Sequence, residues 1–323
     1  MTFNPIPCHE ALQPFIRNYW LLSAQCTAIG TQQIFSNGAA SLHFYLSQAV
    51  KLEDMPHTPV TSEPQNQRTS QPHTSTPSEP QSLKYRTALN RHDIGCMGVI
   101  TEEGPLEIFG VEFVPFCARM FFHIDDTRPH LTPEDTGDDE FGELSNAIHS
   151  ASNNEERKTL LDDFFCKRLS EIPADDINLE RMSDVFHQIV PTDGSVAHPP
   201  IGHEDFTPTD LASTACLSQK QFTRVFNKYV GMNPKTYLRL LRFNKALMEL
   251  RKNAANSKED STSMTEVAWR CGYYDLAHMI SDFRSLCGYS PSEMLAAGAK
   301  LTETFGSQFS GLMKKKIKIE NVI

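Results

Sequence analysis

The chain has 323 residues, of which 39% are hydrophobic and 22% are charged. That length exceeds the needs of one ordinary hydrophobic core, so we expect two domains. The longest apolar runs, such as Phe113–Phe116, are far shorter than the roughly 18 apolar residues that cross a bilayer. The N-terminus lacks the basic and apolar stretches of a secretory signal. These features argue against a membrane-spanning or secreted protein and predict a cytoplasmic one.

The net charge of −10 is divided unevenly along the chain. Residues 1–205 contain 13 Lys or Arg against 30 Asp or Glu, a net charge of −17. Residues 206–298 contain 12 against 8, a net charge of +4, and residues 299–323 contain 5 against 2, a net charge of +3. An acidic partner is therefore expected at the C-terminal end and a different one at the N-terminal end.

Eight cysteines are scattered without CxxC spacing, and several have apolar neighbours, as Cys166 does after two phenylalanines. This arrangement favours reduced structural thiols over a zinc site. His57 and His73 lie among Pro and Thr, without further ligand residues nearby. We therefore expect neither a metal nor a cofactor.

Residues 1–175 form one mixed domain in this interpretation. Strand patterns cover Gln32–Ser36, Ser41–Leu46, Ile94–Ile100 and Leu106–Phe113, and helical periodicity covers Glu140–His149 and Glu155–Leu169. Strands followed by helices predict an α+β N-terminal domain. The N-terminal domain is interrupted at 53–82 by a segment rich in Pro, Ser, Thr, Gln and His, which predicts a disordered insertion.

Residues 176–205 are expected to be a connecting helix and a linker, because Pro191–Asp205 contains several helix-breaking segments. From Phe206 onward, helix start signals recur. They are Thr207–Asp210, Ser218–Gln221, Asn233-Pro234, Ser263–Glu266 and Ser290–Glu293. Five capped helices predict a compact all-α domain over 206–298. The remaining tail, 299–323, contains the basic run Lys314–Lys318, for which a solvated end is favoured over attraction to phosphate.

The helical pattern occurs twice, at an offset of 56–57 residues, with one residue inserted at the second turn. Asp210-Leu211-Ala212 matches Glu266-Val267-Ala268, and Phe226 matches Phe283. Each copy has a short helix, a tight turn and a longer second helix. This is the helix-turn-helix arrangement, in which the second helix enters the major groove of DNA.

The first copy has the composition of a DNA-reading element. No Asp or Glu occurs between Leu211 and Met248, although seven Lys or Arg do. In its second helix Phe222, Val225, Phe226 and Tyr229 form an apolar stripe, so Lys220, Thr223 and Arg224 project from the opposite face, with Asn227 one turn later. Arginine can bond guanine O6 and N7 bidentately. A merely solvated basic face is the alternative interpretation.

This region resembles the AraC/XylS family of transcriptional regulators over Thr207–Leu295. The matching segments are Leu211-Ala212, Ser218–Phe226, Gly231, Asn233-Pro234, Tyr237–Leu250, Val267–Trp269, Gly272–Asp275, Ala277-His278, Asp282–Arg284 and Gly288–Pro291. The resemblance implies two helix-turn-helix units joined by a long helix, reading successive major-groove segments of promoter DNA. It implies a bacterial-type, non-enzymatic regulator that works with RNA polymerase, as activator or repressor.

The resemblance also implies site residues. In the first unit Lys220, Thr223 and Arg224 read bases and Gln221 lies near phosphate, with Asn227 and Lys228 on the same helix. In the second unit the corresponding set is Asp275, Leu276, Ala277, His278 and Ser281. Relatives often have Gln at Leu276 and Arg at Ser281, so we expect the second unit mainly to position the protein. For His278 a packing role is an equal alternative. Trp269, Tyr273 and Tyr289 are expected in the core.

The N-terminal half resembles, less specifically, the sensor-like domains that precede such units, through Pro14–Trp20, Phe35–Gly38, Ser41–Phe44, Gly98–Thr101 and Gly110–Pro115. The resemblance implies binding of a small-molecule effector, homodimerisation, or both. Gly38 is expected to serve a turn and His43 to be structural.

Two alternatives remain open. One is an acidic adaptor that binds DNA non-specifically. The other, more remote, is a methyl acceptor for alkylated DNA, because Pro7-Cys8-His9 is similar to part of the alkyltransferase motif; Glu10 departs from it.

Overall fold

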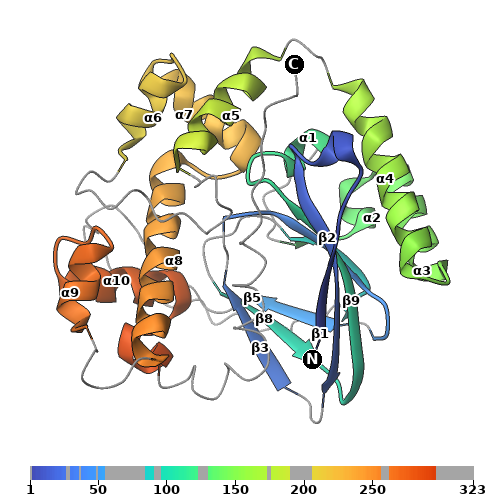
Figure 1. Ribbon diagram of the computed structural model, residues 1–323, viewed down its shortest axis with the longest axis horizontal. Helices are drawn as coiled ribbons and strands as arrows, with labels where there is room; N and C mark the ends of the chain where they lie inside the picture. The colour runs from blue at the N-terminus through green and yellow to red at the C-terminus, as the bar shows by residue number, and fades with distance from the viewer. Residues whose placement is uncertain are drawn as a thin grey trace, which may run out of the picture.

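The computed structural model describes residues 2–26, 30–35, 38–48, 50–54, 84–90, 96–122, 130–172, 176–189, 206–255 and 262–295. Two antiparallel sheets lie beside a group of C-terminal helices, and α3 and α4 run along the far side of the sheets (Figure 1). None of the helices in these ranges has the length and apolar character needed to span a membrane.

The larger sheet has six strands in the order β1 (Thr2–Ile6), β2 (Ile16–Cys26), β9 (Gly104–Phe113), β4 (Ser41–Tyr45), β7 (Thr87–Asn90) and β10 (His130–Leu131). Its two long central strands pair with Trp20 opposite Gly110. A Cβ at Gly110 would lie 2.1 Å from the Trp20 ring, so only glycine allows the indole to pack there.

The smaller sheet has the order β3 (Gly30–Phe35), β8 (Cys96–Thr101), β5 (Val50–Asp54) and β6 (Lys84–Tyr85). All four predicted strands are confirmed with boundary shifts, as β3, β4, β8 and β9. One boundary was wrong. Glu53 and Asp54 belong to β5, opposite Gly98 and Met97, so the insertion cannot begin at residue 53. The rest of the segment to Ser82 lies outside the described residues.

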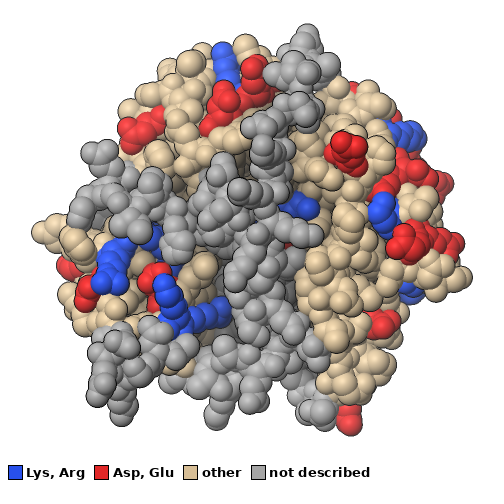
Figure 2. Space-filling model, viewed as in Figure 1, with Lys and Arg blue, Asp and Glu red and all other residues tan. Residues whose placement is uncertain are grey.

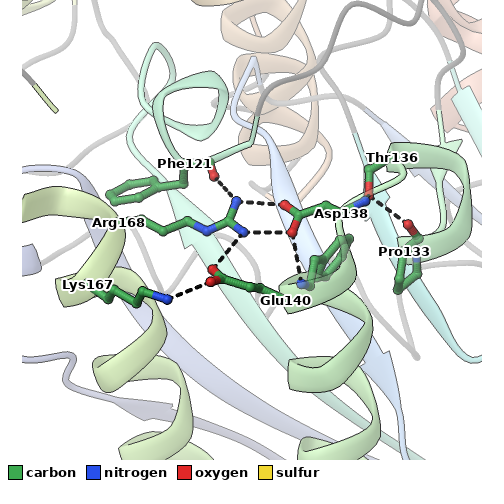
Figure 3. A network of polar contacts seen from close by, with 8 residues as sticks. Phe121, Pro133, Thr136, Asp138, Glu140, Lys167 and Arg168 are labelled. Carbon is green, nitrogen blue, oxygen red and sulfur yellow. Dashed lines mark hydrogen bonds and ion pairs between the residues drawn. The ribbon is translucent and has the colours of Figure 1, made fainter. Parts of the chain in front are cut away.

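Helices α3 (Asp139–Ser150) and α4 (Asn154–Glu171) confirm the predicted helical periodicity and follow α1 (Ala118–Phe121) and α2 (Pro133–Thr136). A buried ion pair holds them together (Figure 3). The guanidinium of Arg168 donates two bonds of 2.7 Å to the carboxylate of Asp138 and one of 2.7 Å to the carbonyl oxygen of Phe121. Glu140 accepts from Arg168 and from Lys167 at the rim of this network.

The C-terminal helices are α6 (Pro208–Thr214), α7 (Gln219–Val230), α8 (Pro234–Ala255), α9 (Met264–Arg270) and α10 (Leu276–Cys287), and residues 291–295 are also helical. The predicted all-α domain is confirmed. Ser218 forms the predicted capping box with Gln221, and the predicted N-cap Thr207 also forms a reciprocal capping box, with Asp210. One cap was missed: α10 begins after Asp275, whose carboxylate accepts from the His278 amide.

Helix α5 (Ile177–Ile189) lies beside α7 and joins the two halves of the molecule (Figure 1). Its Phe186 ring is 4.9 Å from Phe116 of the N-terminal domain, 5.9 Å from Phe226 of α7 and 5.4 Å from Tyr237 of α8, measured between ring centroids. One hydrophobic core therefore runs from the larger sheet into the first helical unit. The expected linker after α5, residues 191–205, lies outside the described residues.

Candidate DNA-binding surface

Helix α7 is fixed by its apolar stripe and by both of its ends. Phe222 and Phe226 are fully buried, and Val225 and Tyr229 are less than 10% exposed, as the sequence predicted. The helix ends at Gly231, which has a φ of +88° and accepts no L side chain without strain. These constraints hold the opposite face of α7 toward solvent.

That exposed face carries the predicted first-unit residues. Lys220, Arg224, Asn227 and Lys228 are all exposed. Neighbouring turns bring Lys220 and Arg224 onto one side, where both can extend into a groove. Arg224 can offer two parallel N–H donors, and Lys220 offers a compact charge.

Three of the first-unit residues, Lys228 among them, have contacts within the protein. The side-chain oxygen of Gln221 accepts from both the amide and the hydroxyl of Ser218, so it serves the cap. Thr223 donates its hydroxyl to the Gln219 carbonyl oxygen at 2.9 Å. The Lys228 ammonium lies 5.4 Å from the Tyr229 ring centroid, and the Lys228 carbonyl oxygen accepts from Arg119 at 3.5 Å. Contact between these three residues and DNA remains a prediction.

The second unit presents a less polar face. Ala277, His278 and Ser281 are exposed on α10, whereas Leu276 is half-buried and packs against the core. Asp275 has a capping role that does not require DNA. The His278 ring lies edge-on to Tyr273 with centroids 5.3 Å apart, so it is both exposed and packed.

Two basic residues of α8 hold the second unit in place. Arg239 donates to Asp282 of α10 at 2.6 Å, and Asp282 is only 5% exposed. The guanidinium of Arg242 lies 5.5 Å from the centroid of the buried Tyr273 ring, whose hydroxyl has a raised pKa because of burial. Of the seven Lys and Arg residues between Leu211 and Met248, Arg239 and Arg242 therefore contact the second unit rather than only solvent.

The expected core positions need one correction. Tyr273 is 2% exposed, as predicted, and Tyr289 is half-buried. Trp269, however, is 58% exposed and Tyr274 is 91% exposed. The expectation that Trp269 lies in the core is therefore wrong. This residue follows the two buried positions of α9, Val267 and Ala268, and turns outward with Arg270. Tyr274 is the residue inserted at the second turn.

In the N-terminal domain, the surroundings of Cys8, His43 and Gly38 indicate structural roles for all three residues. The Cys8 thiol is 6% exposed and donates to the Ile16 carbonyl oxygen, and burial raises its pKa to about 12. A thiol that stays protonated is a poor acceptor for a methyl group, which weakens the alkyltransferase alternative. His43 is buried and hydrogen-bonded to Asn90 at 3.0 Å, and Gly38 has the positive φ of a turn, both as expected.

The visible face of the molecule carries side chains of both signs, in unequal proportions from one region to another. Figure 2 shows acidic side chains, with some basic ones among them, over α3 and α4, further acidic side chains over α5 and α6, and basic side chains mixed with acidic ones near α8 and its neighbours.

Residues 211–297, which comprise both helical units, match a family model described as a helix-turn-helix domain. The C-terminal region is an AraC-type helix-turn-helix domain. Its two units are α6–α7 and α9–α10, with α8 as the long connecting helix (Figure 1). The sequence resemblance is thus confirmed for this domain.

Two relatives are regulators by name. The chain is 29% identical over 90 residues to the HTH-type transcriptional regulator ArgR of Pseudomonas aeruginosa, a match covering 28% of this chain and 25% of that protein. It is 31% identical over 85 residues to the XylDLEGF operon transcriptional activator of Pseudomonas putida, covering 26% and 25%. The chain therefore matches only about a quarter of the length of these relatives. A solved structure of ToxT from Vibrio cholerae O395 aligns with 89% of this chain and 98% of its own, at 12% identity and a TM-score of 0.40.

Proposed function

We propose that this chain is a cytoplasmic, sequence-specific transcriptional regulator of the AraC type, which binds promoter DNA through α7 and α10. The observation that carries the proposal is the face of α7. Lys220 and Arg224 project from a rigidly packed second helix within an AraC-type domain. Rigid presentation of a bidentate donor is what major-groove readout requires.

The division of labour between the units belongs to the same proposal. We assign base reading mainly to Lys220, Thr223 and Arg224. Leu276 and Ala277 can touch a thymine methyl group, and neither can read a donor–acceptor pattern. The second unit therefore mainly sets the register of the protein on DNA, with His278 and Ser281 as its polar contacts.

Residues 1–175 are proposed to regulate the DNA-binding domain at 206–298. The shared core around Phe186 supports this role, because a change in the N-terminal domain reaches α7 through direct packing. We propose RNA polymerase as the protein partner at promoters. A small effector and a second copy of the chain are the candidate ligands of the N-terminal domain.

The second candidate function is that of an adaptor, in which the exposed basic residues of α7 bind DNA phosphates without reading the base sequence. The predicted reading positions of α10 favour it, because they include no Lys or Arg and only one unit offers strong base readers. Affinity measurements on selected and scrambled duplexes at several salt concentrations distinguish the two. If the protein is sequence-specific, we expect it to bind a selected duplex at least about 1,000-fold more tightly than a scrambled duplex at physiological salt. Equal affinities with a steep salt dependence would support the adaptor instead.

A further inference from the structure

The turn of the second helix-turn-helix unit contains one residue more than the turn of the first, and that residue is Tyr274. Leu217 and Tyr273 are equivalent, since each donates its backbone N–H to the carbonyl oxygen of the alanine five residues before it. The equivalent N-caps are Ser218 and Asp275. Ser218 follows Leu217 directly, whereas Tyr274 stands between Tyr273 and Asp275.

The inserted side chain points into solvent. Tyr274 is 91% exposed, the largest exposed fraction among the three large hydrophobic residues that stand out at the described surface; the others are Trp269 at 58% and Ile177 at 54%. An aromatic ring gains free energy when it is buried, and exposed aromatic rings are enriched where a partner later covers them. The position of this ring, one residue before the N-cap of α10, indicates which partner that is.

We propose that Tyr274 binds the DNA backbone beside the second unit, with its hydroxyl donating to a phosphate oxygen and its ring lying against the adjacent sugar. This inference rests on the proposed function. The N-terminal turn of a second helix enters the major groove, so the residue just before that turn lies at the rim of the groove, where the phosphates run.

The chemistry of α10 supports a DNA partner. Its exposed reading positions, Ala277, His278 and Ser281, include no Lys or Arg. The exposed Arg284 lies in the last turn of α10, away from these positions. The N-terminal turn of α10 still has to be held in register, and a neutral phenol can do so. The nearby Asp275 carboxylate is bound to the first turn of its own helix, whose partial positive charge offsets it. Tyr274 also directly precedes Asp275, the N-cap of α10, which favours DNA over a protein partner.

A neutral donor gives a distinctive signature. Lys and Arg release counterions from DNA when they bind phosphate, and so steepen the salt dependence of affinity. Tyr274 does not. We expect Tyr274→Ala to weaken binding about three- to tenfold, by the same factor on selected and random duplexes, without changing the slope of log affinity against log salt.

The experiment compares the full-length wild type with Tyr274→Ala and Tyr274→Phe by fluorescence anisotropy on selected and random duplexes. Ethylation interference then maps the contacted phosphates. We expect ethylation of one phosphate beside the second block to hinder the wild type and to have no effect on Tyr274→Phe. Ile177→Ala, which removes another exposed apolar side chain, should leave affinity unchanged. Circular dichroism should be the same for all four proteins, because both sites are exposed.

Several results would overturn the inference. Unchanged affinity and an unchanged interference pattern would leave Tyr274 without a DNA contact. A loss confined to one base position would make it a base reader. Intact DNA binding with lost transcription would place a protein on this surface. If the wild type bound no DNA at all, the proposed function would fail together with the inference. In each of the other results the wild type binds DNA, so failure of the inference alone can be told apart from failure of the proposed function.

Discussion

Arg224 and Ser281 occupy equivalent places on α7 and α10, 57 residues apart in the sequence. A guanidinium reaches further than a hydroxyl and offers a fork of donors that fits guanine, whereas serine bonds several bases equally well. Both side chains are exposed. We therefore propose that the two units differ in which bases these residues can distinguish, and not in whether the side chains are accessible.

Arg224→Ala should lower affinity by about 1–3 kcal/mol and relax selectivity at one base pair. The reason is the loss of a bidentate contact that only one base satisfies. Affinities for a set of single-base variants of the selected site measure this directly. Arg224→Lys is the matched control, because it retains the charge and the salt slope but not the fork. A uniform loss on every variant of the site would mean that Arg224 binds phosphate.

Leu276→Ala should weaken DNA binding less than Arg224→Ala, because leucine offers only apolar contact to a thymine methyl group. Leu276 is half-buried, so thermal unfolding has to be measured beside affinity to separate lost packing from lost contact. A larger loss of affinity at Leu276, in a variant that is still fully folded, would reverse the assigned hierarchy of the two units.

Among the elements, α5, α7 and the N-terminus of α8 form one packed unit with the N-terminal domain. Tyr237 is fully buried, and its ring lies against Gly38 of the N-terminal domain. The Arg119 side chain of α1 lies beside Gly231, at the end of α7. The second unit depends instead on α8, through Arg239 and Phe243. The first unit is thus the one that a change in the N-terminal domain reaches first.

Gly38→Ala should destabilise the folded protein by more than the strain of an alanine at a positive φ, because the added methyl group would also crowd the Tyr237 ring. The added Cβ would lie 3.0 Å from the Tyr237 ring, and Gly38 has a φ of +82°. Gly288→Ala is the control, because Gly288 has a φ of +80° and no atom within 4 Å of the added Cβ. Both variants incur about 1–2 kcal/mol of backbone strain. Gly38→Ala should lose a further 1–3 kcal/mol or so, from overpacking, in the free energy of unfolding. Equal losses of unfolding free energy in the two variants would mean that the Tyr237 ring moves aside without cost, which would contradict the prediction.

Local signals decided which elements could be predicted from the sequence. The C-terminal helices carry their caps in four-residue segments, so Thr207 and Ser218 marked them clearly. Strand β2 was missed because its buried and half-buried positions do not alternate, and β1 because Pro5 interrupts it. The face of α7 followed from its apolar period. The exposure of Trp269 and the contact of Gly38 with Tyr237 depend on tertiary packing, which no local pattern encodes.

At the scale of the whole molecule, a hydrogen-bonded network lies inside an acidic N-terminal domain. His43 accepts from Asn90, which in turn accepts from His130, while Tyr45 and Trp20 pack against the His43 ring. Burial lowers the pKa of His43 to about 3 and that of His149 to about 4. Both histidines are therefore neutral in the folded protein at neutral pH.

This network makes stability depend on pH with a definite sign. An unfolded histidine takes up a proton near pH 6.5, whereas the folded His43 does not until about pH 3. Neutral His43 therefore costs the folded state nothing above about pH 6.5. As the pH falls from there toward 3, the free energy of unfolding decreases, by up to about 1.4 kcal/mol per pH unit for His43. Urea unfolding at pH 7.5, 6 and 5, followed by Trp20 fluorescence in a Trp269→Phe background, should show this decline. His43→Gln should reduce the slope; an identical slope would exclude His43 as its source.

The central claim is that the first unit reads the sequence and the second sets the register. Selection of bound duplexes from a random pool, by the full-length protein at physiological salt, tests it most directly. We predict enrichment of one strongly specified block and a weaker block about one helical turn away, on the same face of the duplex. Uniform recovery of all sequences, or a stronger block assigned to α10, would contradict the claim.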